Sequence, residues 1–282
     1  VRKVIKKVGV NVEEVGWVER GSGAYIIEDN TYVALFGVPP TTSPREVIKV
    51  IATDGVGNRT VLSLGTGIRR NNFKRVKVEL KEREKFLRPK LLAILGEEEK
   101  EGDFLKLFKK VNEDVRKENT EKIKEIGSGS APERYWSGNF LQHKRSKVIS
   151  RYGERRIYTY GGKLISRSWH LGYDLASVKN SEVLAANRGK VVFAGDLGIY
   201  GNTVIIDHGM GLMSLYSHLA DFVVEEGDLV EKGQLIGFTD MTGLAFGDHL
   251  HFGVLVGGLE VTPLEWWDPK WVKNRIEPAF SG

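Results

Sequence analysis

The chain contains 282 residues with a mass of 31.6 kDa, about twice the size of a typical domain, which predicts two domains. Hydrophobic residues make up 41% and charged residues 28%, so widespread disorder is excluded, and no apolar run reaches the ~18 residues that a membrane-spanning helix needs. The net charge of +5 favours an anionic partner such as nucleic acid, a membrane surface or an acidic wall polymer.

The absence of cysteine limits the chemistry that the chain can perform. It excludes disulfide scaffolds, thiolate zinc sites, iron–sulfur clusters and cysteine nucleophiles. Any metal ion must be held by carboxylates and by the six histidines. The sequence opens with Val1 rather than Met, which leaves room for a leader peptide or a membrane anchor upstream of residue 1.

Residues 1–80 are predicted to form a β-rich accessory module that resembles a small sandwich. Short β-branched and aromatic runs alternate there with turn residues at intervals of roughly 8–12 positions. The turn cluster 54–58 predicts a hairpin, and the stretch 52–59 resembles the hairpin of bacterial immunoglobulin-like modules. The predicted strands are 32–36, 47–52, 60–64 and 73–80.

Residues 81–130 are predicted to form a charged helical segment and linker. Charges of both signs alternate around an apolar stripe, which is typical of a solvated helix face rather than of a nucleic-acid-binding patch. The stripe consists of Phe104, Leu107, Phe108, Val111 and Val115. The Gly- and Ser-rich stretch 127–132 predicts a linker or a domain boundary.

Residues 131–282 are predicted to form an all-β, antiparallel domain. Glycines divide this part into β-branched and aromatic runs, and no long helix is expected between Arg151 and Gly258. The aromatic tail 263–271 is expected to pack in the core rather than to stack on sugars. The predicted strands are 190–194, 203–206, 212–216 and 249–255.

Five of the six histidines lie between residues 170 and 251. A lone histidine usually packs in a core or lies on the surface, but here an HxxxD pattern at 170–174 combines with His218 and with an HxH pattern at 249–251. Side chains at i and i+2 of a strand point to the same face, so His249 and His251 are expected to share one cleft. Imidazole and carboxylate groups are ligands for Zn²⁺, and a catalytic site uses three of them and leaves one position for water.

Six short motifs occur in order along this half of the chain. They are Tyr-Gly-Glu-Arg at 152–155, His-Leu-Gly-Tyr-Asp at 170–174, Gly-Asn-Thr-Val-Ile-Ile-Asp-His-Gly at 201–209, Tyr-Ser-His-Leu at 216–219, a glycine-rich hairpin at 227–237 and His-Leu-His at 249–251. With these motifs, residues 136–267 resemble the LytM/lysostaphin-type zinc metallopeptidases. The resemblance implies a mainly β fold, in which an antiparallel β-sheet catalytic domain follows the accessory module and the helical segment.

The resemblance also implies roles for five residues. His170, Asp174 and His251 would bind one Zn²⁺ ion per chain. His218 and His249 would be the catalytic pair beside the metal, since histidine exchanges protons near neutral pH. Bound zinc polarises a scissile carbonyl and lowers the pKa of its water.

Two other histidines and three departures from the family pattern complete the prediction. His208 matches a family position that is not a ligand, so a packing role is expected, and His143 lies outside the motifs. Asp240, Asp248 and Gly253 replace the usual Gly, Pro and Glu around the HxH motif. Because no ligand is lost, these departures are expected to affect substrate preference more than metal binding.

The function implied by the resemblance is that of a zinc-dependent metalloendopeptidase that hydrolyses peptide bonds in peptidoglycan stem peptides or cross-bridges. Such an enzyme remodels the bacterial cell wall and acts in the periplasm or another extracytoplasmic compartment. The N-terminal region is expected to position the catalytic domain on the wall or to cover its cleft.

Two alternatives remain open at this point. One is a non-catalytic LytM-type scaffold that binds and activates cell wall amidases, and the other is a different zinc amide hydrolase, such as a carboxypeptidase. Nucleic acid is not an expected partner, because no basic stripe interleaved with aromatic residues appears along the sequence. The sequence pattern indicates no particular oligomeric state.

Overall fold

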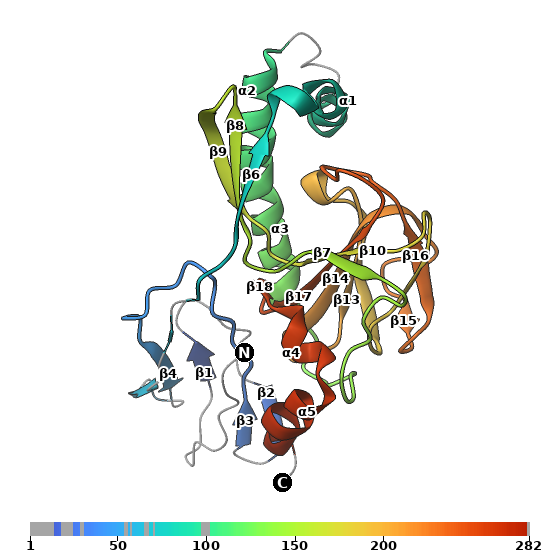
Figure 1. Cartoon of the computed structure of the whole chain (residues 1–282). Coiled ribbons are helices and arrows are strands. Elements are labelled where there is room, and N and C mark those ends of the chain that lie inside the picture. The colour runs from blue at the N-terminus through green and yellow to red at the C-terminus, as the bar shows by residue number, and fades with distance from the viewer. Residues whose placement is uncertain are drawn as a thin grey trace.

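The computed structural model of the chain describes residues 14–17, 25–28, 31–53, 56, 58–64, 68–69, 71–96 and 102–280 (Figure 1). Three parts can be distinguished in it: N-terminal strands, a helical segment with a small three-stranded sheet, and a large twisted β-sheet followed by short helices. The mainly β, antiparallel fold that the sequence predicts is confirmed.

The N-terminal part contains the strands β1 (Glu14–Trp17), β2 (Tyr25–Glu28), β3 (Thr31–Val33), β4 (Ile48–Thr53) and β5 (Arg59–Leu64). Strand β4 pairs antiparallel with β1 on one side and with β5 on the other, which confirms the predicted β4–β5 hairpin. Residues 54, 55 and 57 of its turn lie outside the described part of the chain. Leu35, just after β3, is fully buried in the core of the large sheet and so attaches the N-terminal part to it.

The small sheet consists of β6 (Arg75–Glu79), β8 (Arg155–Tyr160) and β9 (Lys163–Trp169). Strands β8 and β9 form a hairpin, and β6 pairs with β8 in parallel. The strand predicted at 73–80 therefore pairs with the C-terminal half of the chain, not with the strands before it. The physical reason is that Val78 of β6 packs, together with the buried Tyr158 of β8, against the apolar stripe of the helical segment.

The helical segment contains η1 (Lys81–Arg83), α1 (Glu84–Leu95), α2 (Phe104–Lys109), the π-helical turn η3 (Lys110–Val115) and α3 (Arg116–Ser128). Asp103 caps α2 by accepting hydrogen bonds from two backbone N–H groups. The predicted stripe is confirmed, because Phe104, Leu107, Phe108 and Val111 are buried and Val115 packs against them.

The stretch predicted as a linker is held closely against the large sheet. α3 continues to Ser128, and Gly127 allows its backbone to approach Gly258, where a Cβ atom would lie 2.3 Å from the Gly258 Cα. Ser130 Oγ and the Ala131 N–H then donate hydrogen bonds of 2.6 and 2.7 Å to the Asp207 carboxylate. These contacts fix the helical segment relative to the sheet.

The large sheet contains β7 (Lys147–Ser150), β10 (Tyr173–Ala176), β11 (Glu182–Leu184), β12 (Gly189–Asp196), β13 (Asn202–Asp207), β14 (Leu212–Phe222), β15 (Leu229–Val230), β16 (Leu235–Thr239), β17 (Leu250–Val256) and β18 (Leu259–Val261). Its strand order is β15-β12-β13-β14-β17-β10-β7, with β16 on β14 and β11, and β18 on β17. All these pairings are antiparallel.

The two faces of the large sheet are covered by different cores. One core, which we call the aromatic core, contains Trp136, Phe140 and Trp266. Val254 and Val256 of β17 face this core, whereas Leu255 between them faces the helical segment. By the same alternation His251 belongs to the face that the helical segment covers. The strand period thus places the predicted metal ligand beside the helices.

The C-terminal helices α4 (Pro263–Trp267) and α5 (Pro269–Trp271) close the aromatic core. Trp266 is fully buried, with its ring 5.6 Å from that of Trp136 and 5.5 Å from that of Phe140. The predicted packing role of the aromatic tail is therefore confirmed for Trp266. Among the described residues, no helix has the length and apolar character required to cross a membrane.

Candidate metal centre

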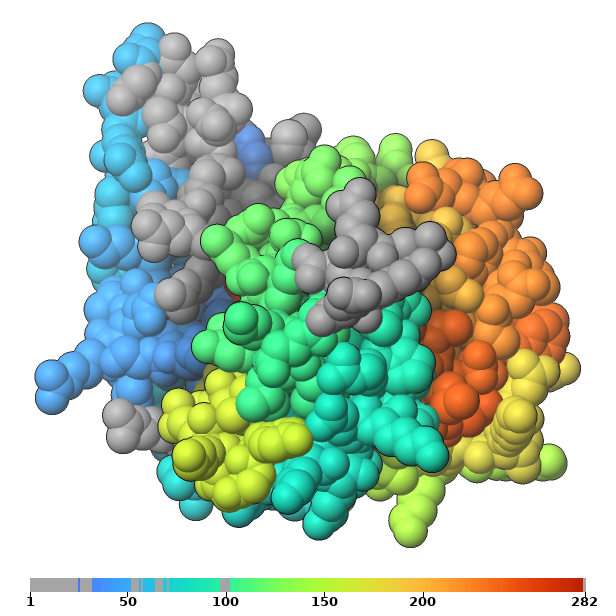
Figure 2. Space-filling view, turned by 90° about the horizontal axis from the view of Figure 1, so that it is seen from above, coloured from blue at the N-terminus to red at the C-terminus, as the bar shows by residue number. Residues whose placement is uncertain are grey.

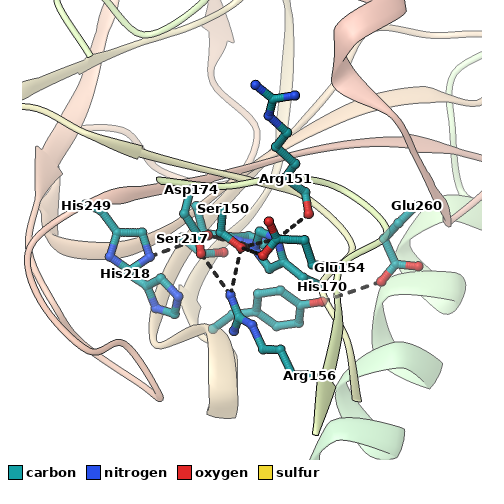
Figure 3. Close-up of polar contacts among 12 residues, drawn as sticks. Ser150, Arg151, Glu154, Arg156, His170, Asp174, Ser217, His218, His249 and Glu260 are labelled. Carbon is teal, nitrogen blue, oxygen red and sulfur yellow. Dashed lines mark hydrogen bonds and ion pairs between the residues drawn. The ribbon is translucent and has the colours of Figure 1, made fainter. Parts of the chain in front are cut away.

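The three residues predicted as zinc ligands converge in one buried cluster. His170 Nε2 lies 2.8 Å from Asp174 Oδ1 and 3.1 Å from His251 Nδ1, and His251 Nδ1 lies 2.8 Å from the same carboxylate oxygen. Each of the three residues is at most 6% exposed. Figure 3 shows His170 and Asp174 pointing toward one another at the centre of a polar network.

The strand pairing explains why the three predicted ligands meet. Asp174 of β10 lies directly opposite His251 of β17, so their side chains share one face of the sheet. His170 follows β9, and its backbone exchanges hydrogen bonds with Glu154 and Gly153. Gly172 is required between the two ligands of the first motif, because a Cβ atom there would lie 2.6 Å from the His251 ring.

The hydrogen bonds of His170 define which of its ring nitrogens can bind a metal. Nδ1 lies 3.0 Å from the Arg151 carbonyl oxygen, which can only accept, so Nδ1 carries the proton. The lone pair of Nε2 then faces Asp174 Oδ1, another acceptor. Two acceptors at this distance repel each other unless a cation lies between them, and imidazole with carboxylate is a donor set of the kind that zinc takes. The cluster therefore fits a zinc ion.

The second carboxylate oxygen of Asp174 is held by a residue that the sequence analysis missed. Arg156 Nη2 donates to Asp174 Oδ2 at 3.0 Å and to Ser150 Oγ at 3.3 Å (Figure 3). Ser150 Oγ in turn donates to Glu154 Oε2 at 2.6 Å. Burial alone lowers the pKa of Arg156, but the negative charge of Asp174 outweighs it and raises that pKa. Arg156 thus stays charged and fixes the orientation of the carboxylate.

Arg156 could have been found only with the strand register in hand. It stands beside Arg155 after the Tyr-Gly-Glu motif, and neighbouring residues on a strand point to opposite faces. The register places Arg156 opposite Val76 and Ser168, on the face toward the helices and the metal ligands.

The pair His218 and His249 lies next to the ligands, with ring centroids 4.9 Å apart. His218 Nδ1 is 2.8 Å from the Thr242 carbonyl oxygen and His249 Nδ1 is 2.7 Å from the Gly247 carbonyl oxygen, so each ring donates from Nδ1 to the backbone. His249 Nε2 lies 3.5 Å from Asp174 Oδ1. His218 also has a positive φ of 64°, a strained backbone conformation of the kind found at functional sites.

The pKa values of His218 and Asp174 are lowered in the folded chain, whereas that of His249 is raised. Burial, followed by the neighbouring rings of His249 and His251, holds the pKa of His218 well below its ordinary value. Burial also acts to lower the pKa of His249, but hydrogen bonding and charge from Asp174 raise it overall. Burial alone raises the pKa of Asp174, yet the close approach of His170, His249 and His251 holds it well below its ordinary range.

A cavity of about 590 Å³ opens onto these five residues. The helical segment contributes Asn112 and Arg116 to its wall, and the loop before β17 contributes Phe246. α1 lies against that loop (Figure 2), where Phe86 stacks on Phe246 with centroids 6.3 Å apart. Lys90 of α1 adds a hydrogen bond to the Met241 carbonyl oxygen. The helical segment therefore forms one wall of the cavity and supports the opposite loop.

The remaining histidines lie outside the cluster. His208 is fully buried, and its ring nitrogens lie 2.7 Å from the Arg188 carbonyl oxygen and 2.7 Å from Ser214 Oγ, which confirms its packing role. Burial lowers the pKa of His208 to about 4. His143 Nε2 lies 3.1 Å from Ser181 Oγ, on the rim of another cavity.

Two of the departures from the family pattern hold the loop before His251. The Asp248 carboxylate accepts hydrogen bonds from Thr239 Oγ1 at 2.7 Å and from the Asn180 N–H at 3.0 Å. The Asp240 carbonyl accepts from the His249 N–H at 3.1 Å. At the third departure, Gly253 lies against Leu215. None of the three changes the ligand cluster.

Comparison with known proteins agrees with this geometry. Residues 168–263 match the model of peptidase family M23. The chain is 39% identical over 132 residues to the DD-carboxypeptidase/endopeptidase Mpg of Neisseria meningitidis, covering 45% of this chain and 30% of that protein. It is 31% identical over 119 residues to the peptidoglycan DD-endopeptidase ShyA of Vibrio cholerae, covering 42% and 27%. The chain thus spans less than a third of the length of either relative.

The fold of nearly the whole chain also has a counterpart of known structure. A putative peptidase M23 from Pseudomonas aeruginosa superposes with a TM-score of 0.58 over 93% of this chain and 91% of that chain, at 20% sequence identity. At this identity the likeness concerns the fold alone. The family match over residues 168–263 confirms the resemblance found in the sequence.

Proposed function

We propose that the chain is a zinc-dependent metalloendopeptidase that hydrolyses peptide bonds in peptidoglycan, in the periplasm or another extracytoplasmic compartment. The convergence of a complete donor set with two further histidines in one cavity carries this proposal. The names of Mpg and ShyA, both peptidases of the DD type and one a peptidoglycan endopeptidase, support the class of substrate.

The proposed ligands are His170 Nε2, Asp174 Oδ1 and His251 Nδ1, which hold one Zn²⁺ per chain. When bound, zinc supplies a Lewis acid that polarises the scissile carbonyl and makes the attacking water more acidic. The chain itself keeps the ligands in place: the Arg151 carbonyl fixes the tautomer of His170, and Arg156 fixes the carboxylate of Asp174.

The proposed catalytic pair is His218 and His249. Backbone carbonyls hold both rings through Nδ1, so neither ring can turn without losing a hydrogen bond. Each Nε2 is then free to orient the water, to take its proton and to return a proton to the leaving amine. His249 Nε2, at 3.5 Å from Asp174 Oδ1, lies close enough to act at the metal ligands.

The scaffold alternative ranks second for a structural reason. A protein that only binds and activates an amidase needs a docking surface, but it does not need three ligands and two anchored histidines around one cavity. All five side chains are present here, and four of them are held by hydrogen bonds to the rest of the chain: His170, Asp174, His218 and His249. The arrangement therefore favours catalysis.

The test is mass spectrometry of cross-linked muropeptides incubated with the zinc-loaded full chain, with and without a chelator. We expect dimers to be converted to monomers, and we expect the chelator to stop the conversion. The zinc-loaded His249→Ala protein is the matched control and should leave the dimers intact. If the wild-type chain binds zinc and cleaves no muropeptide, the endopeptidase proposal is wrong and the scaffold becomes the better reading.

A further inference from the structure

The small sheet β6-β8-β9 has one face packed on helices and one face that carries positive charge. On the packed face, Val78 and Tyr158 contribute to the core, and Ser166 accepts a hydrogen bond of 2.8 Å from Asn112. Because side chains alternate along a strand, the intervening residues point the other way. They bring arginines from distant parts of the sequence together.

The strand register places two arginines and a tryptophan in one row. Arg75 of β6 lies opposite Arg155 of β8, and Arg155 lies opposite Trp169 of β9. Residues opposite each other share a face of the sheet. The Arg155 guanidinium carbon is 5.2 Å from the centroid of the Trp169 ring, and Phe73 packs edge-on against that ring at 5.7 Å. This row ends beside the metal ligand that follows Trp169.

Within the described part of the chain, no acidic side chain neutralises the charges in this row. Among the described residues, no carboxylate forms an ion pair with Arg75 or Arg155. Glu154, the nearest acidic residue in sequence, is buried and accepts a hydrogen bond from Ser150. Like charges on opposite residues of a sheet repel each other, so a bound anion would stabilise this row.

A cavity of about 630 Å³ lies over the row. It is bounded by the proline-rich segment 38–44 and by Arg69, Arg75, Arg155 and Trp169, and no described Asp or Glu lines it. We call this cavity the arginine groove. Its lining combines guanidinium groups, which bind carboxylates in a bidentate manner, with an aromatic ring and prolines.

The arginine groove and the cavity of the candidate metal centre have a lining residue in common. A smaller cavity of about 130 Å³ shares Arg155 and Trp169 with the groove and is also lined by Arg156 and Arg167. Trp169 lines this small cavity, the arginine groove and the cavity of the metal centre. The three cavities therefore share one lining residue, Trp169, at the end of the edge strand β9.

We propose that the arginine groove binds the carboxylate-bearing part of an acidic peptide whose scissile bond lies at the metal centre. This inference rests on the proposed function and deepens it, because it names the chemistry that selects the substrate away from the cleaved bond. Arg75 and Arg155 bind a carboxylate, and Trp169 holds the peptide between the groove and the metal. Residues near 70 and near 155–169 contribute, so the sequence alone shows no basic stripe.

Binding of a dye-labelled wall stem peptide, measured by fluorescence anisotropy, tests the groove. The protein is the zinc-loaded, full-length His249→Ala chain, which leaves the peptide intact. We expect the peptide with free carboxylates to bind about tenfold more tightly than the same peptide with amidated carboxylates. Arg75→Gln and Arg155→Gln should each remove most of this difference.

Lys163→Gln is the matched control, since Lys163 is an exposed cation at the other end of the same sheet and should leave binding unchanged. If both peptides bind equally, or if the arginine variants bind like wild type, the proposed peptide site is wrong even if the wild-type chain cleaves muropeptides. If instead the acidic peptide binds and both arginine variants bind it more weakly, the proposed peptide site is supported even when no cleavage is found. Binding of labelled polyphosphate without binding of the acidic peptide also contradicts the inference.

Discussion

Two buried regions of the chain contain histidine, and their hydrogen bonds differ in one respect. In the core, both ring nitrogens of His208 lie within 2.7 Å of protein oxygens that bond them. At the metal centre, His170, His218 and His249 each use Nδ1 for a backbone carbonyl and direct Nε2 toward a shared cavity. The histidines are buried in both regions, but only at the candidate metal centre does a ring nitrogen lack a backbone or hydroxyl partner within the described part of the chain.

This difference distinguishes the core histidine from the histidines of the candidate metal centre better than burial does. A buried polar atom normally has a partner inside the protein. When several such atoms face one another and their other nitrogen is already fixed, the missing partner comes from outside the chain. Substitutions in the two regions should consequently fail in different ways: loss of metal and activity in one, loss of stability in the other.

The largest effect is expected from a ligand substitution. In His170→Ala one of the three donors is gone, so the remaining Asp174 and His251 cannot retain zinc at micromolar concentration. We expect less than one tenth of the wild-type zinc content by elemental analysis after dialysis, and muropeptide cleavage at background level. Retention of stoichiometric zinc would show that His170 is not a ligand.

His249→Ala is the matched comparison within the same region. It removes a histidine whose nearest approach to the ligands is the 3.5 Å distance to Asp174 Oδ1, so the donor set stays complete. We expect near-stoichiometric zinc with a kcat reduced by about 10²–10⁴-fold. Wild-type cleavage by this variant would contradict the catalytic assignment, and loss of zinc would move His249 into the ligand set.

A smaller effect is expected at Arg156, which tests whether the surroundings of the ligands matter as much as the ligands. Arg156→Gln removes the charge that holds Asp174 Oδ2, and loss of such a partner weakens metal binding by about 10–100-fold. Chelator competition measures the zinc dissociation constant directly. Arg155→Gln is the control, because Arg155 points to the opposite face of the sheet and should leave the zinc dissociation constant unchanged.

The sequence was sufficient to predict the five residues that converge at the candidate metal centre, because the short motifs that carry the family resemblance contain them. It was not sufficient for Arg156 or for the wall that Asn112 and Arg116 provide. Those depend on which elements pack together, and packing between distant segments leaves no local pattern.

The same distinction applies to the fold. Strand β6 has the alternation of a strand, but its partner β8 lies about 80 residues away, so the sequence indicated the strand and not its sheet. Likewise, the Gly- and Ser-rich stretch 127–132 has the composition of a linker, although the Asp207 carboxylate binds Ser130 and Ala131 there. Composition indicates how flexible the backbone of a segment is on its own, and tertiary hydrogen bonds hold that backbone in one conformation.

No effect on zinc binding is expected from the core, where the pH dependence of stability should identify His208. Burial lowers its pKa to about 4 in the folded chain, against 6.5 in the unfolded chain. Between these values the unfolded state binds more protons than the folded state. The free energy of unfolding therefore decreases by up to about 3 kcal/mol as the pH falls from 6.5 to 4, and it does not change through this group above pH 6.5. The glutamine of His208→Gln does not titrate, so the free energy of unfolding of this variant should fall less steeply over this range. The variant should also be less stable at pH 7, because glutamine packs less well than the buried imidazole.

Urea unfolding at several pH values measures the slope for both proteins, and the remaining histidines titrate in both proteins alike. Parallel slopes would show that His208 is not kept neutral by the fold, and the contrast between the core and the metal centre would then rest on the cavity alone.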